Sequence, residues 1–483
     1  SFRPQSDQSR ALPDPGRQLP RQGGTLSSEF PEDSDGKGVC GIEKAFDKIL
    51  YESKGKLSAC FDANGQGSAL SGSGLELADE NYDSPGGIVL TIDKKIQQLT
   101  ENAVDESIAP PVINGRDDFI EAVKKSGIVG LGGAGFPTAV KLGTDLKGGY
   151  ILVNAAECEP GLRHNMVQLE DEEYCAKTVR GALYCMEVAK AGKVIFAVKK
   201  KNISALEVLK KCIKDHPEVS IHVMPDIYPM GEERAVVREC LGITLDPTKL
   251  PSAADAAVVN VETVLRVAEA IEDQKPLITK HVTVRGKLNN GADAHVFLDE
   301  PIGTSVGDLI AKAGGIRGEY GEIILGGAFT GRPCTEADPI VKATGAILVT
   351  LPFEDLKGAK VGLLCCACGG AQDRMEDIAK KYNGEVVSVT FCKQAVEVKP
   401  GAPRKCEDPG NCPGQIAKVM EMKKAGAEYL IIGNCSDCSN TVVTCGTLKM
   451  GLKVIHQTDH VMKTINHELF RELRVSKQVE QNF

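Results

Sequence analysis

The stretch GIVGLGGAGFPTAVKL, residues 127–142, is a glycine-rich apolar loop between two segments with helical patterning. Gly130, Gly132 and Gly135 satisfy the pattern G-x-G-x-x-G, and Gly133 lies between them. Glycines at this density let backbone N–H groups approach an anion, and the start of the following helix adds a favourable dipole. The sequence therefore predicts a loop that binds a phosphate of a nucleotide or a flavin.

This loop differs from an ordinary dinucleotide-binding turn, which needs a strand before the glycines and a helix after them. Only Ile128 and Val129 precede the glycines in β-branched style, and RDDFIEAVKKS (116–126) has a helical pattern. Lys141 follows one turn into the next helix, where its cation is placed to meet a phosphate. An exposed surface lysine is the alternative interpretation.

Polar residues follow a strand-like segment, YILVNAAECEP (150–160), about twenty residues downstream of the loop. Residues at the carboxyl end of a buried strand emerge at a sheet edge, where ligands bind. The candidates there are Asn154, Glu157 and Glu159. Further along, YPMGEERAVVREC (228–240) places Gly231 and Glu232 at an expected helix start, where ordinary capping is the simpler explanation.

These segments, followed by VVNVETVLRVAEAI (258–271), resemble in this order the C subunit of the Rnf electron-transport complex (RnfC-like proteins). More distantly, they are similar to the flavin subunit of respiratory complex I. The resemblance covers roughly residues 112–350. It implies an α/β domain in which the glycine loop and the Asn/Glu strand bind FMN and the NADH that reduces it. The implied cofactor-binding residues are Gly130, Gly132, Gly133, Gly135, Lys141, Asn154, Glu157, Glu159, Gly231 and Glu232.

Composition narrows the class of protein. A chain of 483 residues is long enough for about three domains. The net charge of −9 disfavours a nucleic-acid-binding surface. No apolar run approaches the roughly 18 residues of a membrane span, and no signal-peptide core is present, so we expect a cytoplasmic protein. In such a protein, 17 cysteines indicate metal binding or redox catalysis rather than a disulfide framework.

The N-terminal part of the chain differs from the rest in its amino-acid composition. Residues 1–36 are polar and rich in Pro, Gly and Ser, which predicts a disordered tail. Residues 38–110 are expected to form a small α+β segment, because GVCGIEKAFDKIL (38–50) and GIVLTIDKKIQQLTENAVDES (87–107) resemble the pedestal of penicillin-binding proteins. The transpeptidase motifs that would follow a pedestal are absent. This segment is therefore interpreted as a fusion or a borrowed binding module.

The remaining chain alternates short apolar strands with helical stretches, which predicts parallel α/β sheets. Turn-rich residues near 287–294 interrupt this pattern, and there the RnfC-like resemblance implies a soluble-ligand-binding β-grasp (SLBB) module. The expected boundaries are an FMN- and NADH-binding domain at 112–275, the β-grasp module at 281–330, a connecting segment at 331–358, and a flavodoxin-like, doubly wound, Cys-rich domain at 359–483.

Cysteines in the last domain follow predicted strands. Cys365, Cys366 and Cys368 end the strand at 360–365, Cys392 ends the strand at 384–392, and two more end the strand at 428–435. In an open parallel sheet these carboxyl ends share one edge, so the thiols are expected to converge. Redox catalysis is predicted for Cys365, Cys368, Cys435 and Cys438. If a cluster is bound, its predicted ligands are Cys365, Cys368, Cys392, Cys406, Cys412, Cys435 and Cys438.

The thiols leave three functions open. Cysteines at strand-to-helix turns suit dithiol redox chemistry, because a helix N-terminus lowers the pKa of a thiol. They also suit an iron–sulfur cluster in an electron carrier or adaptor without its own NADH oxidation, or a structural zinc site. The tandem ferredoxin motifs of Rnf C subunits are absent here. The Cys-rich tail instead resembles the proline-reductase-associated electron-transfer proteins (PrdC), which implies D-proline reductase of amino-acid-fermenting anaerobes as the acceptor.

A second, weaker resemblance concerns the same tail. KCEDPGNCPGQ (405–415) and IIGNCSDCSNT (431–441) are similar to the delta subunit of methyl-viologen-reducing hydrogenase. That resemblance implies a [2Fe–2S] cluster. The leading hypothesis remains an NADH-linked flavin oxidoreductase that passes electrons through the C-terminal cysteines to a partner reductase.

Overall fold

The fold was analysed in a computed structural model that describes residues 60–61, 67–68, 115–443, 446, 449–472 and 479–481. The predicted tail at 1–36 lies outside the described residues. So does the pedestal-like segment at 38–110, apart from two short paired strands, β1 (Cys60–Phe61) and β2 (Gly67–Ser68). Residues 110–123 and 128–483 form one compact unit, separate from residues 1–109 and 124–127.

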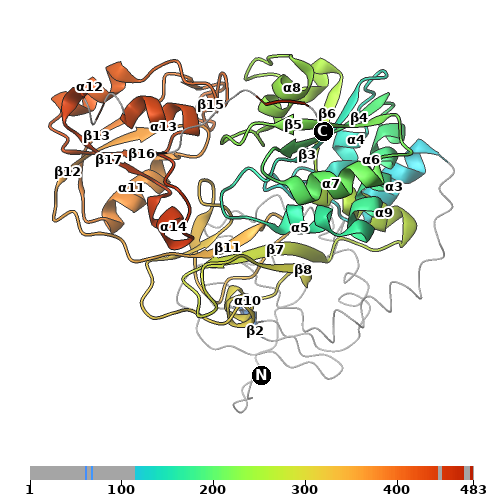
Figure 1. The fold of residues 1–483 in the computed structure, drawn as a ribbon, viewed down its shortest axis with the longest axis horizontal. Helices are drawn as coiled ribbons and strands as arrows, with labels where there is room; N and C mark the ends of the chain where they lie inside the picture. The colour runs from blue at the N-terminus through green and yellow to red at the C-terminus, as the bar shows by residue number, and fades with distance from the viewer. Residues whose placement is uncertain are drawn as a thin grey trace, which may run out of the picture. The chain divides into compact units, whose positions relative to one another are not determined.

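The first sheet is fully parallel and has the strand order β5-β4-β3-β6. Its strands are β3 (Tyr150–Ala155), β4 (Lys193–Lys199), β5 (Val219–Met224) and β6 (Ala256–Asn260). The helices that accompany it are α3 (Arg116–Lys125), α4 (Thr138–Leu142), α5 (His164–Glu170), α6 (Glu172–Val188), α7 (Ile203–Cys212), α8 (Glu233–Leu241), the 3-10 turn η1 (Pro251–Ala254) and α9 (Val261–Glu272). The predicted parallel α/β domain is confirmed (Figure 1).

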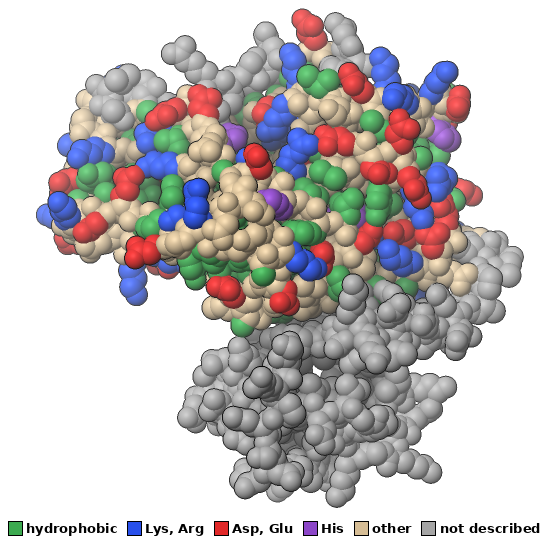
Figure 2. Space-filling model, turned by 60° about the horizontal axis from the view of Figure 1, so that its bottom comes forward, with side chains coloured by type: hydrophobic (Ala, Val, Ile, Leu, Met, Phe, Trp, Pro, Cys, Tyr) green, Lys and Arg blue, Asp and Glu red, His purple; other side chains and the backbone are tan. Residues whose placement is uncertain are grey.

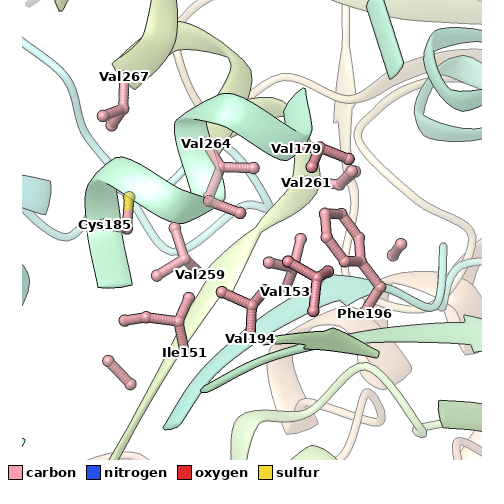
Figure 3. Close-up of a cluster of buried hydrophobic side chains, with 14 of the residues drawn as sticks. Ile151, Val153, Val179, Cys185, Val194, Phe196, Val259, Val261, Val264 and Val267 are labelled. Carbon is pink, nitrogen blue, oxygen red and sulfur yellow. The ribbon is translucent and has the colours of Figure 1, made fainter. Parts of the chain in front are cut away.

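Alternation along these strands divides the core between two faces. Ile151 and Val153 of β3 face α6 and α9, together with Val194 and Phe196 of β4 (Figure 3). Leu152 faces the other way, into a smaller cluster that α8 covers. Apolar side chains fill both faces of the sheet. The strands therefore have the continuous apolar sequences expected of a buried parallel sheet.

The second sheet is mixed and has the order β10-β9-β11-β7-β8. Its strands are β7 (Thr279–Gly286), β8 (His295–Pro301), β9 (Ile323–Leu325), β10 (Arg332–Cys334) and β11 (Ala346–Val349). Helix α10 (Val306–Lys312) packs on the sheet through Leu309 and Ile310. A mixed sheet with one helix fits the predicted β-grasp module. The sheet continues past residue 330, because β11 pairs with both β7 and β9.

The third sheet is parallel and has the order β13-β12-β16-β17. Its strands are β12 (Lys360–Cys365), β13 (Glu385–Phe391), β16 (Tyr429–Ile432) and β17 (Lys453–His456). Helix α11 covers one face, and α12 and α13 pack on the other. The remaining elements are α11 (Gln372–Lys381), β14 (Ala395–Val396), β15 (Lys405–Cys406), α12 (Ile416–Lys424), α13 (Ser436–Val443) and α14 (Asp459–Thr464). This is the predicted flavodoxin-like strand order.

A buried ionic cluster joins α9 to the second sheet. The side chains of Glu262 and Lys280 are both 0% exposed and form an ion pair. Arg266 also donates to Glu262, at 3.2 Å, and to Asp299 of β8, at 2.6 Å. Burial alone would raise the pKa of Glu262, but Lys280, His281 and Arg266 outweigh it and lower that pKa. Since each buried charge has a partner, the desolvation cost of the cluster is offset.

The surface is mixed in charge. On the face shown in Figure 2, acidic and basic side chains are interspersed rather than gathered by sign. Within the described residues, no helix is both long and apolar enough to cross a lipid bilayer.

Gly181 allows α6 and α9 to pack closely. A Cβ atom at this position would lie 1.9 Å from the carbonyl oxygen of Val264, which is backbone and cannot turn away. Gly181→Ala should therefore lower the free energy of unfolding by about 1–3 kcal/mol, as overpacking does, although alanine favours a helix. Urea denaturation measures the change. Gly115→Ala is the control, because its Cβ would meet no described atom within 4 Å; an equal effect of both changes would contradict the packing argument.

Candidate functional site

The topological switch point of the first sheet lies between β3 and β6. The strand order β5-β4-β3-β6 changes direction there, and ligands of open α/β sheets bind at such a point. Asn154 at the end of β3 pairs in register with Asn260 at the end of β6. The glycine loop meets this point, since a Cβ on Gly132 would lie 3.3 Å from Asn260 Nδ2. The sheet therefore places the predicted phosphate loop where a nucleotide is expected.

The loop presents free backbone donors. Gly130 N–H donates to Phe136 O at 2.8 Å, and Gly135 N–H donates to Gly130 O at 3.0 Å, which closes the loop on itself. Leu131 N–H donates to Thr263 Oγ1 at 3.0 Å and so ties the loop to the first turn of α9. Between these ties, the N–H groups of residues 132–134 have no hydrogen-bond partner among the described residues.

Two of the loop glycines have the positive φ that L side chains rarely adopt, with φ of +102° at Gly133 and +62° at Gly135. Residues 132–137 are exposed. Successive unpaired N–H groups in such a turn form an anion-binding concavity. The donor set therefore fits the phosphate of FMN.

Other predicted cofactor ligands are held by protein groups. Lys141 Nζ donates to Val258 O at 2.8 Å, and burial lowers its pKa. Asn154 Nδ2 donates to Gly231 O at 2.8 Å, while its Oδ1 accepts the N–H of Ala156 at 3.1 Å. Glu232 caps α8 by accepting two backbone N–H groups, as the simpler interpretation held. These residues shape the strand end, and the glycine loop supplies the free donors.

Glu157 is a strained and buried carboxylate. Its φ of +39° lies in the left-handed region, which costs energy for a residue with a side chain. Oε1 accepts the N–H of Asn165 at 3.0 Å and lies 3.8 Å from the ring of His164. Burial raises the pKa of Glu157 to about 7 and lowers the pKa of His164 to about 3. A carboxyl group of this kind changes its protonation near neutral pH, which is typical of a functional site.

Glu159 belongs to a different contact. Its carboxylate accepts the N–H groups of Phe329 at 2.8 Å and Thr330 at 3.0 Å, and the Thr330 hydroxyl at 2.7 Å. Burial raises its pKa, and these three donors oppose that shift. The residue predicted to bind NADH therefore holds the loop after β9 against the end of β3.

Phe329 in turn stacks on Tyr228. The two rings are 3.6 Å apart between centroids and inclined by only 5°, and both are buried. The Tyr228 hydroxyl donates to the carbonyl oxygen of Cys368, in the turn that follows β12. The Tyr228 N–H also donates to Ser436 Oγ at 3.1 Å, next to Cys435. The stack thus connects the strand end of the first sheet with two cysteine-bearing turns.

The thiol site lies at the switch point of the third sheet, between β12 and β16. Strand alternation separates two neighbouring cysteines there. Cys365 packs with Val361, Leu363 and Met375 under α11, and burial raises its pKa to about 12. Cys366 lies on the opposite side and lines a cavity. Cys365 therefore faces away from the cavity and from the two groups of thiols described below. Its neighbour Cys366 occupies the position that the sequence had predicted for Cys365.

The first thiol group consists of Cys366, Cys368 and Cys406. The Cys368 N–H donates to Cys366 Sγ at 3.2 Å, and a further hydrogen bond joins the two thiols. The hydrogen bond from Cys368 lowers the pKa of Cys366. Cys368 also hydrogen-bonds Cys406 on the small hairpin β14–β15, and these contacts raise its own pKa.

The second thiol group consists of Cys392, Cys412 and Cys438. Cys438 hydrogen-bonds both of the others, which lowers the pKa of Cys392 to about 7 and that of Cys412 to about 6. Cys392 Sγ also accepts Gln415 Nε2 at 3.0 Å. Cys435 interacts electrostatically with Cys366 and Cys406 of the first group and with Cys412 and Cys438 of the second.

Metal binding receives no support from this arrangement. Among the described residues, no group of three or more His, Cys, Asp or Glu side chains is placed to hold a metal ion. Cys445 lies outside the described residues. The thiols are hydrogen-bonded to one another and to amides, which fits dithiol chemistry. The iron–sulfur cluster stays a prediction.

Comparison with known proteins finds a flavin-binding family that matches the part of the chain around the first sheet. Residues 123–269 match the family described as Nuo51 FMN-binding domain (Complex1_51K). The cobalamin reductase PduS of Salmonella typhimurium is 30% identical over 365 residues, which cover 75% of this chain and 73% of PduS. The chain belongs to the RnfC-like family that includes PduS. It is an electron-transfer protein with an FMN-binding domain.

Two further known proteins match only about half of this chain. The C subunit of the Na⁺-translocating ferredoxin:NAD⁺ oxidoreductase complex of Acetobacterium woodii is 31% identical over 256 residues, 51% of this chain and 56% of that relative. The chain therefore spans about half of that relative. The NAD⁺-reducing [NiFe]-hydrogenase structure in its H₂-reduced state aligns with a TM-score of 0.42 at 23% identity, covering 52% of this chain and 48% of the hydrogenase chain.

Sequence reasoning missed several residues of these sites. Asn260 could have been found from its place directly before V-E-T, because Asn followed by a helix is a capping signal. Cys366 could have been preferred to Cys365 from strand alternation. Tyr228 and Phe329 carry no such local signal, because their contact joins segments about 100 residues apart.

Gly132→Val should abolish FMN binding. The valine Cβ would lie 3.3 Å from Asn260 Nδ2, and its two methyl groups would push the loop away from the switch point. The visible flavin absorbance per mole of purified protein, after incubation with FMN, measures the loss. Circular dichroism confirms that the variant is folded. Stoichiometric flavin in a folded variant would show that the phosphate loop lies elsewhere.

Glu157→Gln should become more stable relative to the wild type as the pH rises. A raised pKa means that the folded carboxyl holds its proton more tightly than the unfolded one, so its stabilisation is full below pH 4.5 and is lost as the pH rises through 7. The full shift corresponds to about 3 kcal/mol.

Urea denaturation at acid, neutral and mildly alkaline pH measures this difference between Glu157→Gln and the wild type. Glu207→Gln on the exposed face of α7 is the matched control. A difference that does not change with pH would contradict the raised pKa of Glu157.

Proposed function

We propose that this protein is an NADH-dependent flavin oxidoreductase that delivers electrons through its C-terminal thiols to a partner reductase. Bound FMN would supply the group that accepts hydride from NADH and passes electrons on. The glycine loop would hold its phosphate through the N–H groups of residues 132–134, and the side chain of Asn260 lies beside the loop at Gly132. Glu157 provides a carboxyl group that binds or releases a proton near neutral pH.

One observation carries the proposal. The Tyr228–Phe329 stack makes continuous contact from Glu159, after the end of β3, to the carbonyl oxygen of Cys368. This path of contacts runs from the segment after β3, whose end borders the proposed nucleotide site, to the turn that carries Cys368. A structural zinc scaffold would need no such link.

The thiols act as the acceptor in this proposal. Oxidised Cys366 and Cys368 would take up two electrons and two protons, and the S–S bond between them would be replaced by two thiols. Cys368, Cys435 and Cys438 are retained from the sequence prediction, and Cys366 takes the place of Cys365. D-proline reductase is the acceptor implied by sequence resemblance, and cobalamin is the second acceptor to assay, because PduS is named a cobalamin reductase.

Cys368→Ser should separate the two half-reactions. Anaerobic addition of NADH to the oxidised protein should bleach the flavin band and raise the number of titratable thiols in the wild type. In Cys368→Ser the flavin should still bleach and reduce an added dye, while the gain of thiols is lost, because the dithiol cannot form. Absorbance and a thiol titration measure the two steps.

Cys334→Ser is the matched control, because this cysteine lies in β10 and packs on the second sheet's core. It should retain both steps. Loss of dye reduction in Cys368→Ser would contradict the order of transfer. A flavin-loaded wild type that NADH does not bleach would contradict NADH as the donor.

A further inference from the structure

A cavity of about 420 Å³ opens beside the first thiol group. Its walls come from residues 329–332 after β9, residues 366–372 after β12, Arg374, Phe391 at the end of β13, and the exposed pair at 403–404. A cavity of this volume suits a small organic molecule rather than a single ion. It lies at the carboxyl ends of the neighbouring parallel strands β12 and β13, the sheet edge at which ligands of open α/β sheets bind.

The charged side chains that line the cavity are all arginines. Arg332 and Arg374 already pair with carboxylates. Arg404 contacts no carboxylate within the described part of the chain. Its guanidinium lies 4.4 Å from the Phe391 ring centroid, and Nη1 donates to Ala395 O at 3.0 Å. The guanidinium keeps further N–H donors at the rim of the cavity, which favours an anionic ligand.

The reactive groups in the cavity wall are Cys366 and Cys368. They are separated by one residue in a turn, and the Cys368 N–H points at Cys366 Sγ. Phe329 and Phe391 provide aromatic surface on the same walls. Helix α11 also begins at the cavity with Ala371 as its N-cap, and no side chain caps its first N–H groups. An anion at this end of the helix is therefore favoured as well.

We infer that this cavity binds a small anionic organic disulfide and that Cys366 and Cys368 reduce it. This inference rests on the proposed function, which supplies the electrons. The Cys366 thiolate attacks one sulfur of the ligand, the ligand's S–S bond breaks, and one thiolate leaves. Cys368 then gives up its proton to the thiolate that has left and attacks Cys366 Sγ, which releases the second half of the ligand and forms the Cys366–Cys368 disulfide. Two electrons pass to the ligand, and the two cysteine protons end on its two thiol products.

The test uses the full chain after chemical reduction and anaerobic removal of the reductant, so that flavin and NADH are not needed. The anionic probe is dithiobis(nitrobenzoate), a disulfide between two carboxylated aromatic rings, and the neutral probe is dithiodipyridine. In the wild type the anionic probe should show a fast phase. Arg404→Ala should slow that phase about tenfold, the loss expected for one charge-assisted contact. The reaction of the neutral probe should change by less than about twofold.

Control variants make the result specific. Arg317→Ala removes an exposed arginine outside the cavity and should leave both probes unchanged. Arg404→Lys should recover part of the rate with the anionic probe. Cys366→Ser should remove the fast phase with both probes.

Two results would overturn the inference: equal slowing of both probes in Arg404→Ala, or an intact fast phase in Cys366→Ser. The proposed function is judged separately, by whether NADH restores the thiols that a probe has oxidised. If charge-selective reduction of the probe occurs and NADH does not restore the thiols, the proposed function fails while the cavity assignment stands.

Discussion

The stacked pair of Tyr228 and Phe329 is the contact on which the arrangement of the sites depends. Tyr228 comes from the segment after β5 and Phe329 from the loop after β9, and both enter a core shared with Leu364 and Leu430 of the third sheet. The two rings lie face to face, an arrangement less favourable than the offset-stacked and edge-to-face pairs that contribute about 0.5–1.5 kcal/mol beyond their buried area. The larger effect of the stack is geometric, because one pair of rigid rings fixes the third sheet against loops from both of the others.

Polar groups fix the two ends of that stack. Glu159 holds the Phe329 backbone with a half-buried carboxylate, and a carboxylate withdrawn from water is tolerated where donors satisfy it. At the other end, the Tyr228 hydroxyl donates to the Cys368 carbonyl oxygen, so its buried oxygen is also paired. Each polar group on this path therefore has a hydrogen-bond partner, and each hydrogen bond fixes the direction of the groups that it joins. A shift of either loop would leave a buried donor or acceptor without a partner, which makes the alignment costly to change.

The sequence predicted the parts of this structure that are decided locally. The strands β3, β12 and β16 are short runs of apolar residues between helical stretches, and period and length identify them. The convergence of the thiols followed from the rule that parallel strands end at one edge. The distinction between Cys365 and Cys366 was also local, but it depends on where a strand ends to within one residue, and strand ends are the least certain part of such a prediction.

Other features could not be read from local pattern. β11 pairs with β7 although β8, α10, β9 and β10 lie between them in the chain, so a segment assigned as a connection became the central strand of the second sheet. Glu159 has the side chain and the sequence position expected of a nucleotide-binding residue. Its contact with the loop at Phe329 becomes apparent only in the folded chain. In both cases, a partner far along the chain decides the function of a residue, and a single sequence does not name that partner.

The hydrogen bonds within each thiol group shift the pKa values of its members in opposite directions. In each group a central thiol donates hydrogen bonds to its neighbours: Cys368 lowers the pKa of Cys366, and Cys438 lowers those of Cys392 and Cys412. Each group therefore pairs a stabilised thiolate with a thiol that keeps its proton. In thiol–disulfide exchange a thiolate attacks one disulfide sulfur and the other sulfur leaves as a thiolate, so a hydrogen bond that stabilises a thiolate favours the attacking sulfur of each group. Cys435 is buried, burial raises its pKa, and it interacts electrostatically with Cys366 and Cys406 of the first group and with Cys412 of the second.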